Sequence, residues 1–121
     1  MANFTLDMSR FANKSLGEIE QVVRKTAIDL TTSIIKSTPV DTGRARANWF
    51  VSFESAIEDT TDDTNSAKAL SNATNTLLNG KIGKYIYIQN NLDYAVKLEY
   101  GASKQAAQGM VRINVERFAK R

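Results

Sequence analysis

The chain has 121 residues, of which 42% are hydrophobic and 24% are charged, and its formal net charge is +3. This length and balance predict one globular domain over residues 1–121 and exclude a disordered chain. Because the sequence contains neither cysteine nor histidine, it excludes disulfides, thiol nucleophiles, Ser-His-Asp catalysis and zinc sites built from those residues.

The first predicted element is a long helix that ends before Pro39. Its apolar residues recur at helical spacing: Leu16, Ile19, Val23, Ala27, Leu30 and Ile34. Ser15 and Glu18 fit a capping box, which favours a start at residue 15, although a start at Ser9 is equally compatible. Thr38 precedes a proline and is therefore disfavoured in helical conformation. We expect a helix over residues 15–37 or 9–37.

A turn is predicted directly after this helix. The triplet Asp-Thr-Gly at residues 41–43 also carries the catalytic carboxylate of aspartic proteases. However, Arg44 and Arg46 follow it and would hold that carboxylate ionised, against the shared proton that protease catalysis needs. We therefore interpret the turn as structural, with four residues that serve the backbone: Pro39, Asp41, Thr42 and Gly43. The two arginines are expected on one side of an extended segment.

Two strands and a helix are predicted in the middle of the chain. Trp49, Val51 and Phe53 alternate with other residues, which predicts a strand over 49–54. Residues 58–66 are acidic and predicted to form a loop. A helix over 67–78 is indicated by apolar residues at helical spacing: Ala69, Leu70, Ala73, Leu77 and Leu78. The second strand is predicted over 84–89.

The C-terminal third is predicted to contain two short elements. Asp93 as N-cap and Gly101 just after the end predict a helix of one or two turns between them. Residues 109–118 are ambiguous, because Val111, Ile113 and Val115 alternate as in a strand. A helical stripe also fits, through Ala107, Val111, Val115 and Phe118. We predict a strand at the start of this segment and a helix at its end.

Together these elements predict an α+β fold. We expect the long N-terminal helix to pack on a small, mostly antiparallel sheet, with one or two further short helices. No apolar run approaches the ~18 residues that span a bilayer, and the first residues lack the apolar core of a secretory signal. We therefore expect a soluble protein without membrane partners.

Charge is distributed unevenly along the chain. Residues 51–67 carry five acidic residues and no Lys or Arg, whereas residues 103–121 carry five basic residues against Glu116 alone. Such segments can meet between copies of the chain, face a polyanion, or form two solvated surfaces. Five basic residues are candidates for an interface or for facing DNA: Arg44, Arg46, Lys104, Arg112 and Arg117.

The acidic residues are not expected to form a metal site. The segment from Asp59 to Asp63 lacks the glycine and terminal glutamate of a calcium-binding loop. The loop over residues 54–66 also offers few apolar side chains to bury, so we expect it to be mobile in the isolated subunit. No pattern in the sequence predicts catalytic residues or a cofactor site.

Two stretches of the sequence resemble a known family. Residues 39–49 (PVDTGRARANW) resemble a segment of the tail-completion and minor tail proteins of long-tailed bacteriophages, the lambda minor tail protein Z type found at the head–tail junction. Residues 93–101 (DYAVKLEYG) and 102–112 (ASKQAAQGMVR) resemble later segments of that family, in the same order and at the same spacing. Where this chain has Ala107, the family often has proline. The acidic loop is the part that matches least.

The resemblance implies a non-enzymatic, structural protein of the virion. Such a subunit assembles into a homo-oligomeric ring that completes the tail end, contacts tail-tube, terminator or head-completion proteins, and lets genomic DNA pass without sequence-specific binding. It needs no cofactor, and it assembles in the host bacterial cytoplasm. An alternative from another class is a small basic nucleic-acid-binding module that uses Arg44, Arg46 and the basic end on phosphates.

Overall fold

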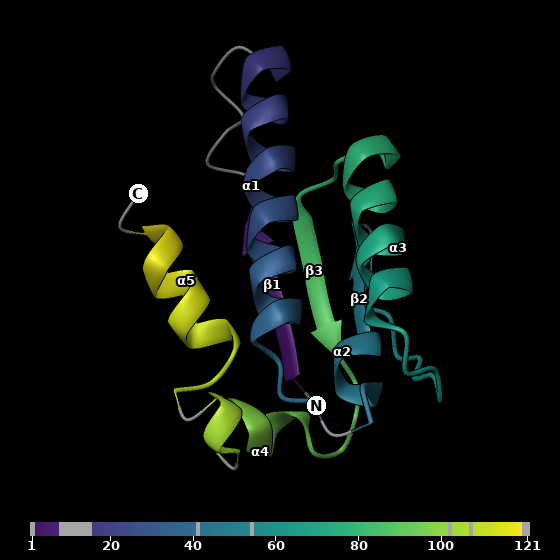
Figure 1. The fold of residues 1–121 in the computed structure, drawn as a ribbon. Coiled ribbons are helices and arrows are strands. Elements are labelled where there is room, and N and C mark those ends of the chain that lie inside the picture. Colours follow the sequence, from purple (N-terminus) through teal and green to yellow (C-terminus); the bar gives the residue numbers. More distant parts are fainter. Residues whose placement is uncertain are drawn as a thin grey trace.

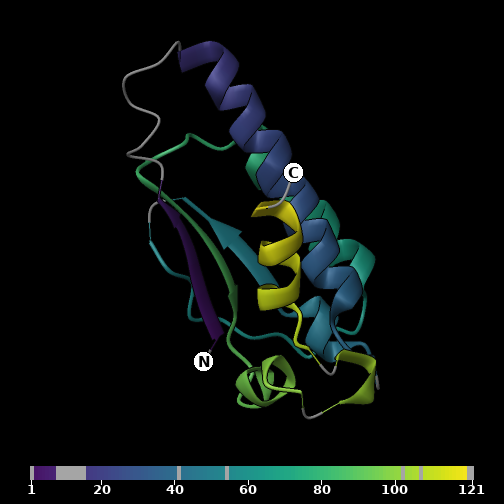
Figure 2. The same ribbon diagram turned by 90° about the vertical axis from the view of Figure 1, so that its left-hand side faces the viewer.

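A three-stranded antiparallel sheet forms one layer of the molecule, and the longer helices form the other (Figures 1 and 2). The computed structural model describes residues 2–7, 16–40, 42–53, 55–101, 103–106 and 108–119. The strand order is β1-β3-β2, with β1 at Ala2–Asp7, β2 at Trp49–Ser52 and β3 at Tyr85–Asn90. The central strand β3 pairs with both neighbours, so that Asn90 lies opposite Ala2 on one side and opposite Trp49 on the other.

The longer helices lie on one face of this sheet, whereas the short helix at Ala95–Glu99 lies beyond the strand ends, as Figure 2 shows. The longest is α1 at Leu16–Ser37, and α3 at Ser66–Asn79 packs against both α1 and β2. The short helix α2 at Arg44–Ala47 connects α1 to β2. Near the end of the chain, α4 at Ala95–Glu99 and the 3-10 turn η2 at Lys104–Ala106 lead into α5 at Val111–Ala119, which packs on α1. The predicted α+β class is confirmed.

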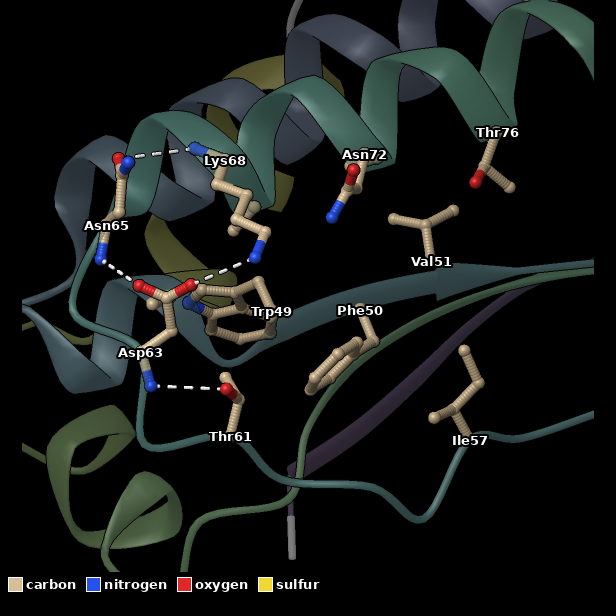
Figure 3. Close-up of a pocket in the computed structure, with 13 residues that line it drawn as sticks. Trp49, Phe50, Val51, Ile57, Thr61, Asp63, Asn65, Lys68, Asn72 and Thr76 are labelled. Atoms are coloured by element: carbon tan, nitrogen blue, oxygen red, sulfur yellow. Dashed lines mark hydrogen bonds and ion pairs between the residues drawn. The ribbon is translucent and has the colours of Figure 1, made fainter.

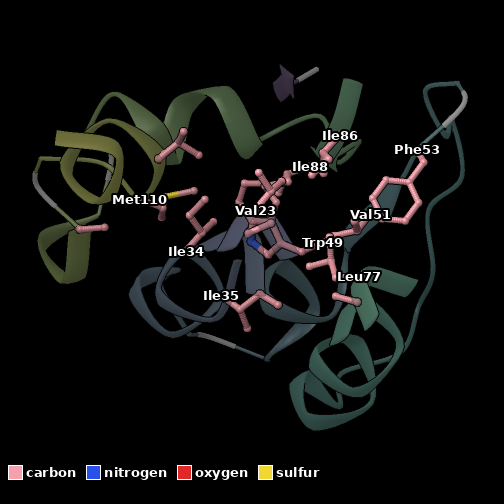
Figure 4. Packing of buried hydrophobic residues seen from close by; sticks show 14 residues of the cluster. Val23, Ile34, Ile35, Trp49, Val51, Phe53, Leu77, Ile86, Ile88 and Met110 are labelled. Atoms are coloured by element: carbon pink, nitrogen blue, oxygen red, sulfur yellow. The ribbon is translucent and has the colours of Figure 1, made fainter. Parts of the chain in front are cut away.

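The core lies between α1, α3 and the sheet and is centred on Trp49 (Figure 4). Trp49 is 1% exposed, and its indole N–H donates to the hydroxyl of Thr38 at 2.9 Å. That hydroxyl in turn donates to the carbonyl of Ile34 at 2.7 Å, so the end of α1 is joined to the start of β2. Loss of a buried tryptophan side chain costs about 3–5 kcal/mol in comparable cores.

Most of the predicted amphipathic patterns are confirmed. On α1, Val23, Ala27 and Ile34 are buried, while Ile19 and Leu30 are partly buried against the same core. In the strand predicted over 49–54, Trp49, Val51 and Phe53 are all buried. On α3 the same holds for Ala69, Ala73 and Leu77. Leu78 was predicted to join that stripe but is 56% exposed, which corrects the prediction. Ser15, the predicted cap, lies outside the described residues.

Three sequence predictions are wrong in the backbone, and one strand was missed. β1 was not predicted, because its pairing with β3 joins residues that are between 78 positions (Asp7 and Tyr85) and 88 positions (Ala2 and Asn90) apart. Arg44 and Arg46 lie in the helical turn α2 and not in an extended segment. Asp93 does not cap α4, whose N-cap is Tyr94 without a side-chain hydrogen bond.

The fourth correction concerns the ambiguous segment near the C-terminus. All of α5 is helical, including the start that we predicted as a strand. Helical spacing places Val111 and Asn114 on the buried side, whereas Val115 is 47% exposed. The amide of Asn114 donates to the hydroxyl of Ser37 at 3.0 Å and thereby holds α5 on α1.

Among the described helices, none is long and apolar enough to span a membrane.

Candidate interface where the two motifs meet

The two motif segments lie against each other at the end of α1, although they are about sixty residues apart in sequence. The side-chain amide of Gln105 pairs with the backbone of Val40: it accepts from the N–H at 2.9 Å and donates to the carbonyl at 3.0 Å. Ala45 packs with the buried Leu92 and Ala95 in a small second core. The family-like segments therefore form one continuous structural unit, which we call the motif junction (residues 38–49 and 92–112).

Arg46 holds the end of α1 within this junction. Its Nε donates to the carbonyl of Thr38 and its Nη2 to the carbonyl of Lys36, both at 2.8 Å. The last carbonyls of a helix lack partners within the helix, so a guanidinium group placed there satisfies them and complements the helix dipole. Arg46 therefore has a structural role, because it satisfies backbone carbonyls at the C-terminal end of α1.

The turn before α2 depends on Gly43. Its φ is 93°, and a Cβ built on it would lie 2.5 Å from the carbonyl oxygen of Thr64. The positive φ that we predicted is confirmed, and the close approach of Thr64 adds a second reason for glycine. The hydroxyl of Thr42 accepts from the N–H of Arg44 at 3.2 Å. Asp41, which was predicted to stabilise the same turn, lies outside the described residues.

Polar side chains hold the acidic loop against the sheet. The amide of Asn48 donates to the carbonyl of Thr61 at 2.9 Å and accepts from its N–H at 2.8 Å. Further along, the N–H of Ile57 donates to the side chain of Gln89 at 2.6 Å, and Asn91 donates to the carbonyls of Ile57 and Asp59. These bonds argue against the mobility that we expected from the composition of the loop.

Among the described acidic residues of the motif junction, Glu99 is the one that is buried. It is 5% exposed, and its Oε1 accepts from the N–H groups of Met110 and Val111, each at 2.8 Å. Its Oε2 accepts from both the N–H and the Nε of Arg112 at 3.0 Å. A carboxylate from α4 therefore caps the N-terminus of α5, where the helix dipole favours negative charge.

The pKa of Glu99 lies below its ordinary value. Burial by itself would raise the pKa, because it disfavours the ionised carboxylate. The hydrogen bonds from Val111, Arg112 and Met110 outweigh burial, since they favour the charged form. Glu99 is therefore ionised at neutral pH and serves as a fixed negative charge inside the fold.

The structure separates the five candidate basic residues into two groups. Arg44 donates through Nε to the carbonyl of Thr61 and pairs with Asp62 at 3.3 Å, and Arg46 is bound to the end of α1. Arg112 pairs with Glu99, and its guanidinium carbon lies 4.7 Å from the centroid of the Tyr100 ring. By contrast, Lys104 and Arg117 are exposed and take part in no ion pair among the residues described.

A hollow of about 400 Å³ opens on the surface of the motif junction. Both motifs contribute to it, through Pro39, Val40 and Ala45 on one side and Tyr94 and Leu98 on the other. Val40 and Tyr94 remain 38% and 39% exposed, so the hollow presents apolar surface to solvent. We call it the junction hollow.

Sequence reasoning did not single out Asn48, Glu99 or Asn114, which form the polar connections described above. Each is a polar residue that lies between apolar neighbours in the sequence, and this was the available signal.

Within the described ranges, no group of three or more acidic residues is arranged to hold a metal ion. Comparison with models of protein families, with curated proteins and with solved structures finds no match.

Proposed function

We propose that the chain is a non-enzymatic structural subunit of a bacteriophage virion. In this proposal it completes the tail end at the head–tail junction as a ring of identical subunits, and the genome passes through that ring. The observation that carries the proposal is the resemblance of residues 39–49 and 93–112 to tail-completion and minor tail proteins, together with the packing of those segments into one motif junction.

The roles of individual motif residues support this proposal. Arg46, Gly43 and Glu99 serve the backbone around them, as the contacts above describe. Residues with such roles recur together when a fold is shared, and fold alone does not determine function. The junction hollow adds an exposed apolar surface next to these residues, which is the usual character of a protein–protein contact. We assign it to a neighbouring protein of the tail.

A mass measurement tests the proposal. The protein is weighed alone over a concentration series and again with its candidate tail-tube partner, and the expected result is a ring that forms on the tube. Val40→Asp places a charge in the junction hollow and is expected to reduce tube binding at least ten-fold. Val22→Asp is the matched control, because Val22 is 63% exposed on the far part of α1. Equal loss in both variants, or no binding by the wild type, contradicts the proposal.

The nucleic-acid alternative is tested in the same preparation. Two of the arginines that it would use, Arg44 and Arg46, are engaged with backbone carbonyls of their own chain. We therefore expect weak duplex binding that is independent of sequence and falls steeply with salt. A sequence-specific complex at nanomolar concentration and physiological salt would replace the ring proposal with the nucleic-acid module.

A further inference from the structure

A second hollow lies along the free edge of the sheet. β2 is an edge strand of the described sheet, and beside it a hollow of about 370 Å³ opens between α3 and the loop that precedes α3 (Figure 3). In Figure 3, Asn72 and Thr76 of α3 lie above the strand, whereas Phe50 and Ile57 lie below it. An adjoining hollow of about 350 Å³ shares Ile57 and Thr76 and reaches Lys81. We call the two hollows together the β2 groove.

The edge of β2 that faces the groove has backbone groups available for pairing. In an antiparallel sheet, alternate residues of an edge strand direct their N–H and C=O groups away from the neighbouring strand. Among the described residues, no backbone hydrogen bond joins Phe50, Val51 or Ser52 to a segment other than β3. The sequence of β2, WFVS, contains neither a charge nor a proline that would oppose a further strand. The groove is therefore open to backbone pairing.

The two walls of the groove lie on opposite faces of the sheet. Val51 belongs to the core, whereas Phe50 alternates with it and points to the other face. A strand added beside β2 would direct its own side chains alternately to the two walls. One wall is apolar, with Phe50 and Ile57 half-buried, and the other carries the polar side chains of Asn72 and Thr76. The groove therefore fits an extended segment in which apolar and polar residues alternate.

The charged lining favours an acidic residue at one end of that segment. Asp63 and Lys68 pair at 3.4 Å and neutralise each other (Figure 3). Lys81 lines the adjoining hollow, is exposed, and takes part in no ion pair among the described residues. Glu58 and Asp59 belong to the loop but line neither hollow. The described lining is therefore positive at the Lys81 end.

We propose that the β2 groove binds an extended segment of another protein, which adds to the sheet as a fourth strand. The segment directs alternate apolar side chains toward Phe50 and Ile57 and a carboxylate toward Lys81. Backbone pairing supplies affinity, and the two walls select the side chains, as in other cases of strand addition. The groove admits a single extended chain, because β2 of a second copy is recessed between its own α3 and loop. The inference goes beyond the proposed function and requires no ring.

Peptide binding to the full chain tests the proposal. Two fluorescent probes of about six residues with capped ends alternate valine with threonine. One probe carries glutamate at its first position and the other at its last, because an added strand can run in either direction. The expected result is saturable fluorescence polarisation with at least one probe below ~1 mM. A failure of both probes to saturate at that concentration overturns the proposal.

N-methylation of the bound probe tests whether its backbone pairs with β2. Each N-methyl group removes one N–H donor, and in an added strand only alternate residues direct that donor toward β2. Two versions of the probe, methylated at odd or at even positions, should therefore differ. We expect one version to bind at least about ten-fold more weakly and the other to bind like the parent. Equal effects of both patterns contradict strand addition.

Substitutions in the groove locate the binding site, after their melting temperatures are compared. Asn72→Trp places a large ring in the groove and should weaken probe binding at least about ten-fold, whereas Ser71→Trp alters an exposed neighbour that lines neither hollow. Lys81→Glu should weaken binding roughly five-fold and favour a probe with lysine in place of glutamate. Lys84→Glu is the matched control, at an exposed lysine outside the lining. Equal effects at 71 and 72, or at 81 and 84, contradict the assignment.

The outcomes separate this proposal from the virion role. Self-association that the probe abolishes would assign the groove to a second copy and overturn the choice of partner. If a probe binds but the protein does not join the tail tube, the groove assignment stands and the virion role fails. If rings form on the tube and neither probe binds, the virion role stands and the groove assignment fails.

Discussion

Replacing Glu99 by glutamine tests whether a buried carboxylate holds α5 in place. Glutamine has nearly the same shape but is neutral, and its amide nitrogen donates hydrogen bonds where a carboxylate oxygen accepts them. In the native chain, the two carboxylate oxygens accept four hydrogen bonds from Met110, Val111 and Arg112. After the substitution, the amide nitrogen of glutamine takes the place of one carboxylate oxygen. A donor then faces N–H groups that are themselves donors.

The size of the effect follows from these contacts. Hydrogen bonds to a charged group contribute about 1.5–3 kcal/mol each, and glutamine can still make the two at its oxygen. The two at Arg112 are lost, but its side chain is 54% exposed, so water replaces part of them. We expect the free energy of unfolding to fall by about 2–4 kcal/mol at neutral pH. For a domain of this size, that lowers the melting temperature by on the order of 10 °C.

The pH dependence separates lost charge from lost packing. The pKa of Glu99 is lowered in the folded state from its ordinary value of 4.5, so its stabilisation is complete above that value and is lost as pH falls through the folded pKa. Urea unfolding followed by circular dichroism should therefore show the gap between wild type and Glu99→Gln closing on acidification. Glu58→Gln is the control, at an exposed carboxylate. A gap below about 0.5 kcal/mol at pH 7, or one that is independent of pH, refutes this role for Glu99.

Two further predictions concern the turn and the acidic loop. Gly43→Ala should destabilise the fold by about 2–3 kcal/mol in thermal unfolding, because the new Cβ meets a backbone carbonyl at positive φ; Gly17→Ala, in open space on α1, should instead be neutral or stabilise by about 0.5–1 kcal/mol. Equal effects at the two glycines would contradict the close approach. In amide exchange, the N–H groups of Ile57 and Thr61 should exchange more slowly than their loop neighbours, and Asn48→Ala should release Thr61 selectively. Uniformly fast exchange across the loop would restore the mobility predicted from composition.

The elements with strong local amphipathic patterns could be predicted from the sequence. The apolar residues of α1 recur at helical spacing, and those around Trp49 alternate as in a strand. Each pattern indicates both the type of element and the side that is buried. Prediction worked less well for α5, where Val111, Ile113 and Val115 alternate as in a strand. There the first N–H groups of the helix are satisfied by Glu99, a residue of a different element, which no local pattern reveals.

Contacts between distant segments account for what the sequence did not reveal. Three sets of hydrogen bonds join residues that no local pattern relates. They are the pairing of β1 with β3, the bond between Gln105 and Val40, and the bond between Asn48 and Thr61. A polar residue in a chain of apolar neighbours indicates that it needs partners, but it does not identify them. The composition of the acidic loop likewise does not reveal the hydrogen bonds that its backbone makes, because their partners Asn48, Gln89 and Asn91 lie outside it.

Arg112 and Arg117 differ in whether their charge is paired within the fold, and a charge reversal therefore tests different things at the two positions. Both lie on α5 and both were candidates for an interface or for facing DNA, yet Arg112 pairs with Glu99 and its guanidinium group lies over the ring of Tyr100. Arg112→Glu would place a second carboxylate beside a buried one, and an assembly assay would record the resulting unfolding as a lost interface. Arg117 has no such partner among the described ion pairs, so Arg117→Glu changes the surface while leaving the contacts that hold α5 intact. A loss of assembly in Arg117→Glu, with an unchanged melting temperature, therefore reports on docking between subunits.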